Sequence, residues 1–327
     1  NLFNINTNEW SQGDTGGTAR EQHTAVEFED QIFYFGGNNE NGFAVPFDVY
    51  DIPTFQANNT QESQNQIVIG NNQASDRRGH SSVSYQGRIY IWGGVNPTFL
   101  NTLEIYDPEQ DSWNNEPSTS GVLRENFVME QIKGKLVIHG GTDPSGLVTS
   151  DLDIYNIDTK SWSKGSSDGT ARKNHAGINY NGKLYTWGGE NQNGQLINSL
   201  EIYDSSSDNW FQRTADGTPR KSHCACEFEG KIYFWGGVDS NDNLVSTFDI
   251  YDINSNVWFE GPSSDDPRRY SSCESFEGKL YFIGGENELG ITSSKMSIYD
   301  VGKNLWMQSI SDEIFRRKKS SVSLING

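Results

Sequence analysis

KIYFWGG, residues 231–237, has five counterparts elsewhere in this chain of 327 residues. They are QIFYFGG at 31–37, RIYIWGG at 88–94, KLVIHGG at 135–141, KLYTWGG at 183–189 and KLYFIGG at 279–285. The second glycines of successive copies are 57, 47, 48, 48 and 48 residues apart. A near-constant period of this length is typical of a repeat protein in which each repeat is one supersecondary unit.

Each unit carries further residues at fixed distances from its glycine pair. An arginine and a short alternating segment precede the apolar run, and a tyrosine follows it seven residues before a tryptophan. The pairs are Tyr106/Trp113, Tyr155/Trp162, Tyr203/Trp210, Tyr251/Trp258 and Tyr299/Trp306. These patterns predict four short antiparallel strands per unit and no helix. Because a small sheet with two apolar faces needs a neighbour on each side, the sequence predicts an all-β propeller.

The apolar run ending in Gly-Gly, the spaced Tyr and Trp, and the Pro-Arg or Ala-Arg before the next unit together resemble the kelch repeat. The resemblance extends over essentially the whole chain and implies a kelch-type β-propeller of four-stranded antiparallel blades. We therefore expect one kelch domain over residues 1–327, with complete repeats at about 20–316.

The number of blades is predicted from the arginines that open the units, at 20, 77, 124, 172, 220, 268 and 317. Seven openings favour seven blades, one of them shared between residues 1–19 and 317–327, as is familiar in kelch proteins. Six blades are the alternative. The unit after Arg20 is atypical, because no tryptophan follows Tyr50 by seven residues and an Asn/Gln-rich segment occupies 58–75.

Charge and cysteine content limit the partners and the compartment that we expect. The formal net charge is −19, from 25 basic and 44 acidic side chains, which disfavours nucleic-acid binding through phosphates. No apolar run is long enough to span a membrane, so no direct membrane insertion is expected. Three cysteines are too few for a disulfide framework and favour a reducing, cytoplasmic setting. Cys224 and Cys226 share one strand face, whereas Cys273 has the opposite parity, so we predict buried thiols and no shared metal site.

The histidines and carboxylates suggest no catalytic site. His23, His80, His175 and His223 each stand three residues after a unit-opening arginine, and a repeated position predicts a structural role, such as a hydrogen bond between neighbouring strands. His139 is predicted to be a satisfied core residue. No metalloprotease, paired CxxC or nucleophile-elbow motif is present, so we expect no enzyme, cofactor or metal. The alternative is an enzyme or carbohydrate-binding propeller, similar to sialic acid mutarotase, with a ligand in the central channel.

The candidate binding residues belong to two sets at one mouth of the predicted channel. The first set is the unit-opening arginines, Arg20, Arg77, Arg124, Arg172, Arg220, Arg268 and Arg317, since arginine suits bidentate recognition of carboxylates. The resemblance implies that this mouth receives acidic or extended peptides; the competing interpretation gives each arginine an internal partner. A second basic residue follows in Arg78, Lys173, Lys221, Arg269 and Lys318.

The second set is apolar and lies in the variable loops that follow the glycine pairs. Phe43, Phe99 and Leu147 stand in otherwise polar loops, where they are candidate anchors for a protein partner. We therefore predict a non-catalytic protein-interaction scaffold that binds a partner protein or an acidic or extended peptide through this face, within a larger protein or assembly.

Overall fold

The computed structural model describes residues 77–110, 112–117, 123–213, 216–276, 278–291 and 295–311, and, before them, the backbone of seven short strands. These strands are β1 (Leu2–Asn4), β2 (Glu9–Ser11), β3 (Thr24–Phe28), β4 (Gln31–Phe35), β5 (Asn38–Asn39), β6 (Gly42–Phe43) and β7 (Asp48–Asp51). The described residues contain strands and turns but no helix. The all-β prediction is confirmed for them.

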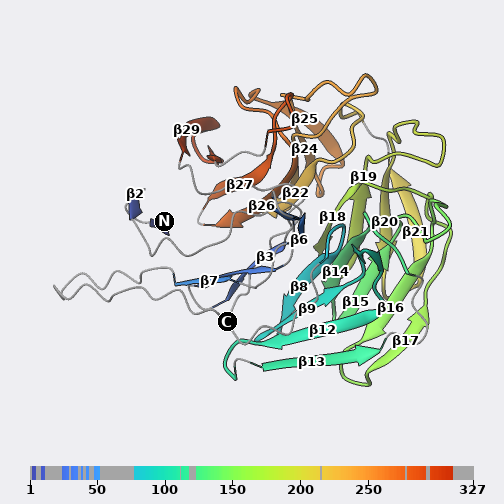
Figure 1. Ribbon diagram of the computed structural model, residues 1–327. Coiled ribbons are helices and arrows are strands. Elements are labelled where there is room, and N and C mark those ends of the chain that lie inside the picture. Colours follow the sequence, from blue (N-terminus) through green and yellow to red (C-terminus); the bar gives the residue numbers. More distant parts are fainter. Residues whose placement is uncertain are drawn as a thin grey trace.

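Five four-stranded antiparallel sheets form the described blades, and they follow one another around a centre (Figure 1). The first strand of each is innermost. The first blade contains β8 (Ser81–Tyr85), β9 (Arg88–Trp92), β12 (Thr102–Asp107) and β13 (Ser112–Pro117). The second contains β14 (Val128–Ile132), β15 (Lys135–His139), β16 (Leu152–Asn156) and β17 (Ser161–Lys164). The third contains β18 (Ala176–Tyr180), β19 (Lys183–Trp187), β20 (Leu200–Asp204) and β21 (Asn209–Arg213). The fourth contains β22 (Cys224–Phe228), β23 (Lys231–Trp235), β24 (Phe248–Asp252) and β25 (Val257–Gly261), and the fifth β26 (Arg269–Phe276), β27 (Lys279–Glu286), β28 (Lys295–Asp300) and β29 (Leu305–Ser311).

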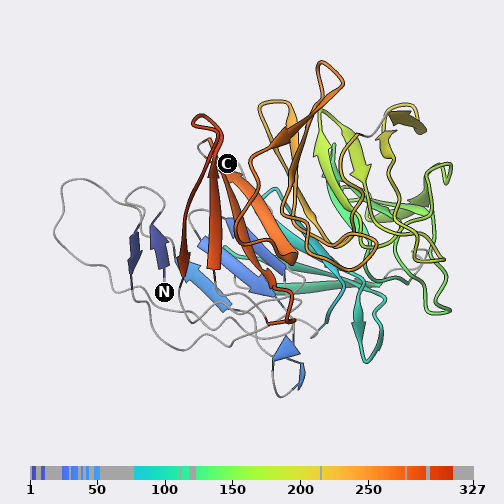
Figure 2. The same ribbon diagram turned by 90° about the horizontal axis from the view of Figure 1, so that it is seen from above.

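The predicted number of blades needs correction. The described residues form five complete blades, neither the seven that we predicted nor the alternative six. Among the described residues, the unit after Arg20 supplies the three-stranded sheet β3-β4-β7, which lies between the first and fifth blades (Figures 1 and 2). No tryptophan follows Tyr50 by seven residues in this unit, and residues 52–76 lie outside the described part of the chain. Strands β1 and β2 pair with each other alone, and the expected contribution of 317–327 lies outside the described residues.

The turn between the first two strands of a blade follows directly from its residues. In the first blade Gln86 and Gly87 both have positive φ, 48° and 72°, and Asn181 and Gly182 in the third have 48° and 78°. Two successive residues of this kind make the tight hairpin whose twist matches that of the flanking strands. Glycine at the second position reaches this conformation without steric cost, so each unit folds back at once.

The core lies between the blades. Trp187, which precedes the glycine pair of the third blade, is fully buried. It packs in one cluster with Tyr185, Leu200, Phe234 and other apolar residues of the third and fourth blades. The seven-residue spacing of Tyr and Trp is a cross-strand pair: Tyr203 faces Trp210 on β21, with ring centroids 5.3 Å apart. Such aromatic pairs bury large areas and stabilise the blade interfaces.

Candidate interaction face

Backbone hydrogen bonds between successive blades build a continuous rim at the mouth of the channel. One residue per blade, two positions after the unit-opening arginine, donates its N–H to the carbonyl oxygen of its counterpart. The bonds run from Asn126 to Gly79 at 2.9 Å, Asn174 to Asn126 at 3.1 Å, Ser222 to Asn174 at 2.8 Å and Tyr270 to Ser222 at 2.8 Å. All five residues have φ between 54° and 66°, a conformation that non-glycine residues adopt at a cost.

The glycine pairs join the same rim from the other side. The N–H of Gly189, for example, donates to the carbonyl of Arg220 at 2.9 Å, and that of Gly141 donates to Arg172 at 2.8 Å. A Cβ atom on Gly189 would lie 2.5 Å from the carbonyl oxygen of Lys173. The second glycine is therefore required both for its positive φ of 80° and for close approach of two backbones.

The unit-opening arginines do not line this face in the structure. The five described side chains, Arg77, Arg124, Arg172, Arg220 and Arg268, are each at most 1% exposed. Every one donates a hydrogen bond to the first glycine of its own blade's pair, such as Arg220 Nη1 to Gly236 O at 3.2 Å. The structure thus gives these guanidinium groups internal partners, and recognition of a partner's carboxylates would require another arrangement. Arg20 and Arg317 lie outside the described residues.

Carboxylates on the third strand complete the arginine sites, and sequence reasoning missed them. Arg77 pairs with Glu104, Arg124 with Asp153 and Arg220 with Asp249, and Arg172 lies 3.0 Å from Glu201. The signal was an acidic residue 27 or 29 positions after the arginine. In the fifth blade the equivalent residue is Ser297, whose hydroxyl accepts a bond of 2.8 Å from Arg268. Burial lowers the pKa of Arg220 to about 10, which leaves it protonated at neutral pH.

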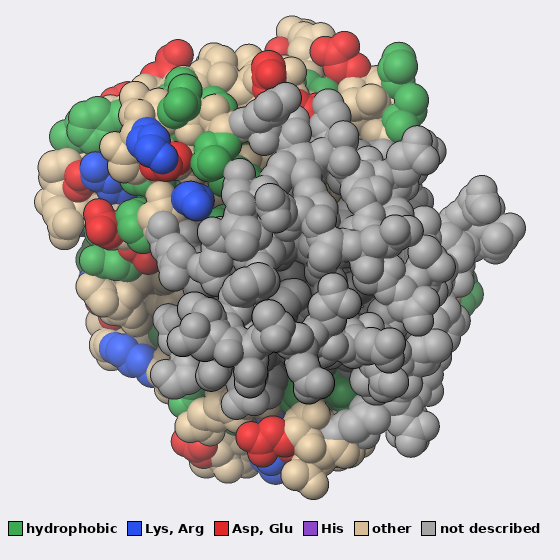
Figure 3. All heavy atoms as spheres, turned by 90° about the vertical axis from the view of Figure 1, so that its left-hand side faces the viewer, with side chains coloured by type: hydrophobic (Ala, Val, Ile, Leu, Met, Phe, Trp, Pro, Cys, Tyr) green, Lys and Arg blue, Asp and Glu red, His purple; other side chains and the backbone are tan. Residues whose placement is uncertain are grey.

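The second basic residue is at least partly exposed in the described units, and Lys173, Lys221 and Arg269 lie beside acidic side chains. Lys221 Nζ is 3.1 Å from Glu190 and 3.4 Å from Asp242, and Arg269 pairs with Glu286. Hydrogen bonds to Glu190 raise the pKa of Lys221 against the opposing effect of partial burial. Basic, acidic and hydrophobic side chains are likewise interspersed among the described residues in Figure 3. The described part of the face has mixed charge.

Four post-glycine loops, 142–147, 190–195, 238–243 and 286–291, share one internal scaffold. In each, the second residue accepts two backbone N–H bonds through its side-chain oxygen. Asp143 Oδ1 accepts from Ser145 at 2.8 Å and Leu147 at 2.9 Å, and Asn287 Oδ1 accepts from Leu289 and Ile291, both at 3.0 Å. These Asx-type turns hold the loop backbone in place before any partner arrives.

Apolar side chains project from two of these post-glycine loops. Leu147, predicted as an anchor, is 54% exposed. Leu289 and Ile291 of the fifth blade, which sequence reasoning missed, are 81% and 49% exposed. Ile291 occupies the same loop position as Leu147, and this equivalence was the available signal. Phe99 is only partly exposed, in the small hairpin of β10 (Val95–Asn96) and β11 (Thr98–Phe99). The side chain of Phe43 lies outside the described residues.

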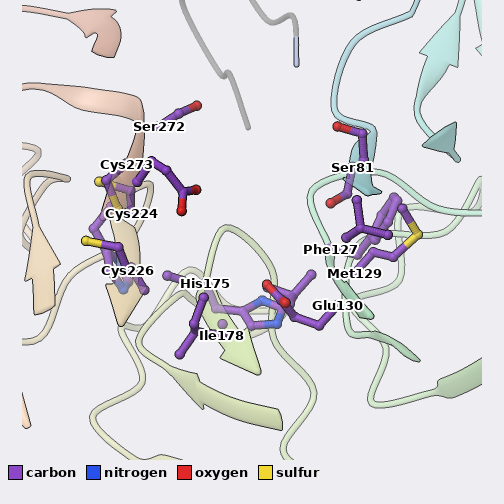
Figure 4. A pocket seen from close by; sticks show the side chains of 18 of the residues that line it. Ser81, Phe127, Met129, Glu130, His175, Ile178, Cys224, Cys226, Ser272 and Cys273 are labelled. Carbon is purple, nitrogen blue, oxygen red and sulfur yellow. The ribbon is translucent and has the colours of Figure 1, made fainter. Parts of the chain in front are cut away.

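The five innermost strands enclose a central cavity of about 770 Å³ (Figure 4). Its lining includes Ser82, Ser84, Glu130, Asn179 and Glu274, and no lysine or arginine among the described residues. Burial raises the pKa of Glu130 to about 8, although a backbone hydrogen bond from Asn179 opposes the rise. The carboxyl group is therefore largely protonated at neutral pH.

Cys224, Cys226 and Cys273 are free and buried, as expected, and the structure adds that they belong to one cluster (Figure 4). Cys224 and Cys226 lie on the face of β22 that turns toward the next blade. Because Cys273 has the opposite parity on β26, its side chain lies on the facing side of that blade, and the three side chains meet at the interface. No group of three or more His, Cys, Asp or Glu residues in the described part is arranged to hold a metal ion.

The repeated histidines pack against aromatic neighbours at the blade interfaces. The His223 ring lies against Trp187 with centroids 5.1 Å apart, and the His175 ring lies 5.4 Å from that of His139. The ring nitrogens of His175 have no hydrogen-bond partner among the described residues, so the predicted hydrogen bond is not made there. His139 is fully buried, as predicted for a core residue. Its two ring nitrogens have no hydrogen-bond partner among the described residues, whereas we had predicted that they would be satisfied. Burial, reinforced by neighbouring arginines, lowers the pKa of His139 and His223 well below the ordinary value, so both rings are neutral. His23 lies outside the described residues.

Comparison with known proteins agrees with this architecture. "Structure of YjhT" superposes with a TM-score of 0.73 at 15% identity, covering 89% of this chain and 98% of that one. Acyl-CoA-binding domain-containing protein 4 of Arabidopsis thaliana is 24% identical over 48% of this chain, and Kelch domain-containing protein 3 of Bos taurus is 25% identical over 42%. The aligned parts are 25% and 39% of these relatives, so this chain spans less than half of each. No helix in the described residues is long and apolar enough to cross a membrane. The KLHDC2/KLHL20/DRC7 Kelch-repeats domain matches residues 1–170 and 126–326, and the chain belongs to this family.

Proposed function

We propose that residues 1–327 form one kelch propeller domain that acts as a protein-interaction scaffold within a larger protein or assembly. The observation that carries this proposal is the group Leu147, Leu289 and Ile291, three exposed apolar side chains on hydrogen-bonded loops at the same end of the propeller. Exposed apolar groups on a fixed backbone suit a protein partner, because little ordering entropy is lost on docking. The three free, buried thiols support a reducing, cytoplasmic setting.

The partner that we propose is a protein segment, extended and with acidic residues, lying across the post-glycine loops. Its apolar side chains would contact Leu147, Leu289 and Ile291. Its acidic groups would compete with Glu190 for Lys221 and Lys173, which lie 3.1 and 3.7 Å from that carboxylate. Because these cations are partly exposed and already paired, the electrostatic contribution to affinity is small and falls with added salt.

Affinity capture with matched variants tests the proposal. The triple variant Leu147→Ser, Leu289→Ser, Ile291→Ser is compared with the parent and with Leu305→Ser. Leu305 is 56% exposed but begins β29, at the opposite end of the blade from the post-glycine loops. A stoichiometric protein that the parent and Leu305→Ser retain, and the triple variant loses, supports the proposed face. Equal recovery by all three folded proteins contradicts it.

The central cavity supports one alternative, a propeller that binds or converts a small polar ligand such as a sugar. Its volume of about 770 Å³ falls in the range of small-molecule sites, and its serines, asparagine and glutamates could hydrogen-bond hydroxyl groups. Calorimetric titration with sialic acid and neutral monosaccharides separates the two functions. Ser82 and Asn179 are the residues to replace, because loss of heat in those variants would place the ligand in the channel.

A further inference from the structure

The three cysteines gather at one blade interface, where their buried side chains belong to one cluster. Cys224 and Cys226 lie two residues apart on β22, and Cys273 lies on β26 of the next blade. The Cys273 side chain packs with both of the others in one buried cluster. Figure 4 shows the three side chains on one wall of the cavity, across from Ser81, Phe127 and Met129.

The register explains why one thiol meets two. Counted from the unit-opening arginine, Cys224 and Cys226 are the fourth and sixth residues and Cys273 is the fifth. Cys273 therefore stands between the other two along the strand direction, on the face that turns toward them. Cys224 and Cys226 are about 7 Å apart along one strand, too far for a disulfide with each other. Every intramolecular disulfide in this cluster must include Cys273.

We propose that this cluster is an oxidative modification site, at which hydrogen peroxide or another small hydroperoxide converts Cys226 and Cys273 to a disulfide that links the fourth and fifth blades. The cavity gives a small, neutral oxidant access to the thiols, which line it. No further cofactor is needed, because the hydroperoxide accepts the two electrons that the thiols lose.

The two thiols have different roles in the reaction. The Cys273 thiol donates to the Cys226 sulfur and lowers the pKa of Cys226, which opposes the larger effect of burial. Burial raises the pKa of both thiols, that of Cys273 well above its ordinary value, so Cys226 ionises more readily of the two and is the attacking sulfur. Its sulfur attacks the peroxide, the O–O bond breaks, and one water leaves to give the sulfenic acid. The Cys273 sulfur then displaces the hydroxyl group, which takes the thiol proton and leaves as a second water. One S–S bond has formed and two S–H bonds have been lost.

Cys224 supplies a third, exchangeable position. Its thiol lies 3.7 Å from the carbonyl oxygen of Trp235 and also contacts Cys273. Attack of Cys224 on the Cys273 sulfur would release Cys226 and leave a Cys224–Cys273 disulfide. The link between the blades would persist through this exchange.

Peptide mapping of the full chain tests the proposal. The protein is treated with hydrogen peroxide at neutral pH, its remaining thiols are alkylated, and it is digested without reduction. We expect a peptide pair joined through Cys273, one alkylated cysteine, and reversal by dithiothreitol. Because burial keeps the thiols protonated, the initial rate should rise up to about tenfold between pH 7 and 8. The thermal unfolding midpoint of the oxidised protein should rise by a few degrees.

Two serine variants make the assignment specific. Cys224→Ser should still form the disulfide. Cys273→Ser should form none, and both of its remaining cysteines should be recovered as thiols after treatment with dithiothreitol. Native tryptophan fluorescence shows whether each variant is folded. If a variant does not fold, peptide mapping of the parent protein still tests the proposal. The proposal is overturned if native protein yields only sulfinic acid, a Cys224–Cys226 link or disulfides between molecules. It is also overturned if the link forms only in urea.

Discussion

Replacing Arg220 by methionine should destabilise the propeller strongly while leaving its surface unchanged. The buried guanidinium donates to Gly236 O at 3.2 Å and Thr247 O at 2.9 Å, and it pairs with Asp249, which is 5% exposed. Methionine keeps most of the apolar volume beside Trp187 but removes the cation that pairs with that carboxylate and donates to the two carbonyls. Breaking a buried ion pair costs about 3–5 kcal/mol, a large fraction of a typical total stability of about 5–15 kcal/mol.

The neighbouring residue provides the control. Lys221 also forms two ion pairs, but its side chain is 24% exposed. Lys221→Met should therefore cost about 0–1 kcal/mol. In the double variant Arg220→Met, Asp249→Leu no buried charge is left unpaired, so it should recover part of the loss.

Urea unfolding followed by tryptophan fluorescence measures all four proteins, and the shift in midpoint decides between them. If Arg220→Met unfolds at the same urea concentration as Lys221→Met, the arginine is not a structural residue. A double variant no more stable than Arg220→Met would show that packing, not the unpaired charge, causes the loss.

Three further predictions follow from the same geometry. Ser222→Gly should raise stability by about 0.5–1 kcal/mol in thermal unfolding because its φ is 59°, whereas Ser163→Gly in strand β17 should lower it by a similar amount. Gly189→Ala should cost more than Gly146→Ala, since both have φ near 80° but only Gly189 has a backbone atom within 4 Å of the added Cβ; equal losses in urea unfolding would show that φ alone matters. Burial keeps the pKa of His175 well below 6.5 in the folded protein, so protons bind preferentially to the unfolded chain, and this residue alone contributes a fall in stability of about 1 kcal/mol per pH unit below pH 6.5. His175→Phe should reduce this pH dependence, and an unchanged slope would contradict it.

The repeat period was sufficient to predict the blades, because apolar periodicity and paired glycines recur in every unit. The number of blades was not predictable in the same way. One unit lacks the tryptophan that marks the fourth strand of the others, and local sequence cannot show how strands from the two ends of a chain pair. The Tyr–Trp spacing, by contrast, reports a cross-strand pair such as Tyr203 and Trp210, which depends on turn length alone.

The candidate site was harder to predict, because it depends on the directions of side chains between units. Position along the repeat placed Arg172 correctly at the rim, but only its contact with Glu201 shows that the guanidinium points inward. The same limitation affected Cys273, whose parity was read correctly. What was missing was that opposite parities on neighbouring blades face each other. Leu289 has no apolar counterpart in the other loops, so repeat comparison could not identify it.

The described unit-opening arginines are interior, and we propose that partners bind at the post-glycine loops instead. Modification of the native protein with phenylglyoxal, followed by mass spectrometry, tests the first part directly. Arg78, which is exposed, and Arg269, which is partly exposed, should react. Arg77, Arg124, Arg172, Arg220 and Arg268 should stay unmodified until the protein is unfolded. Modification of those five at the rate of Arg78 would contradict the account and restore the arginines as candidates for partner binding.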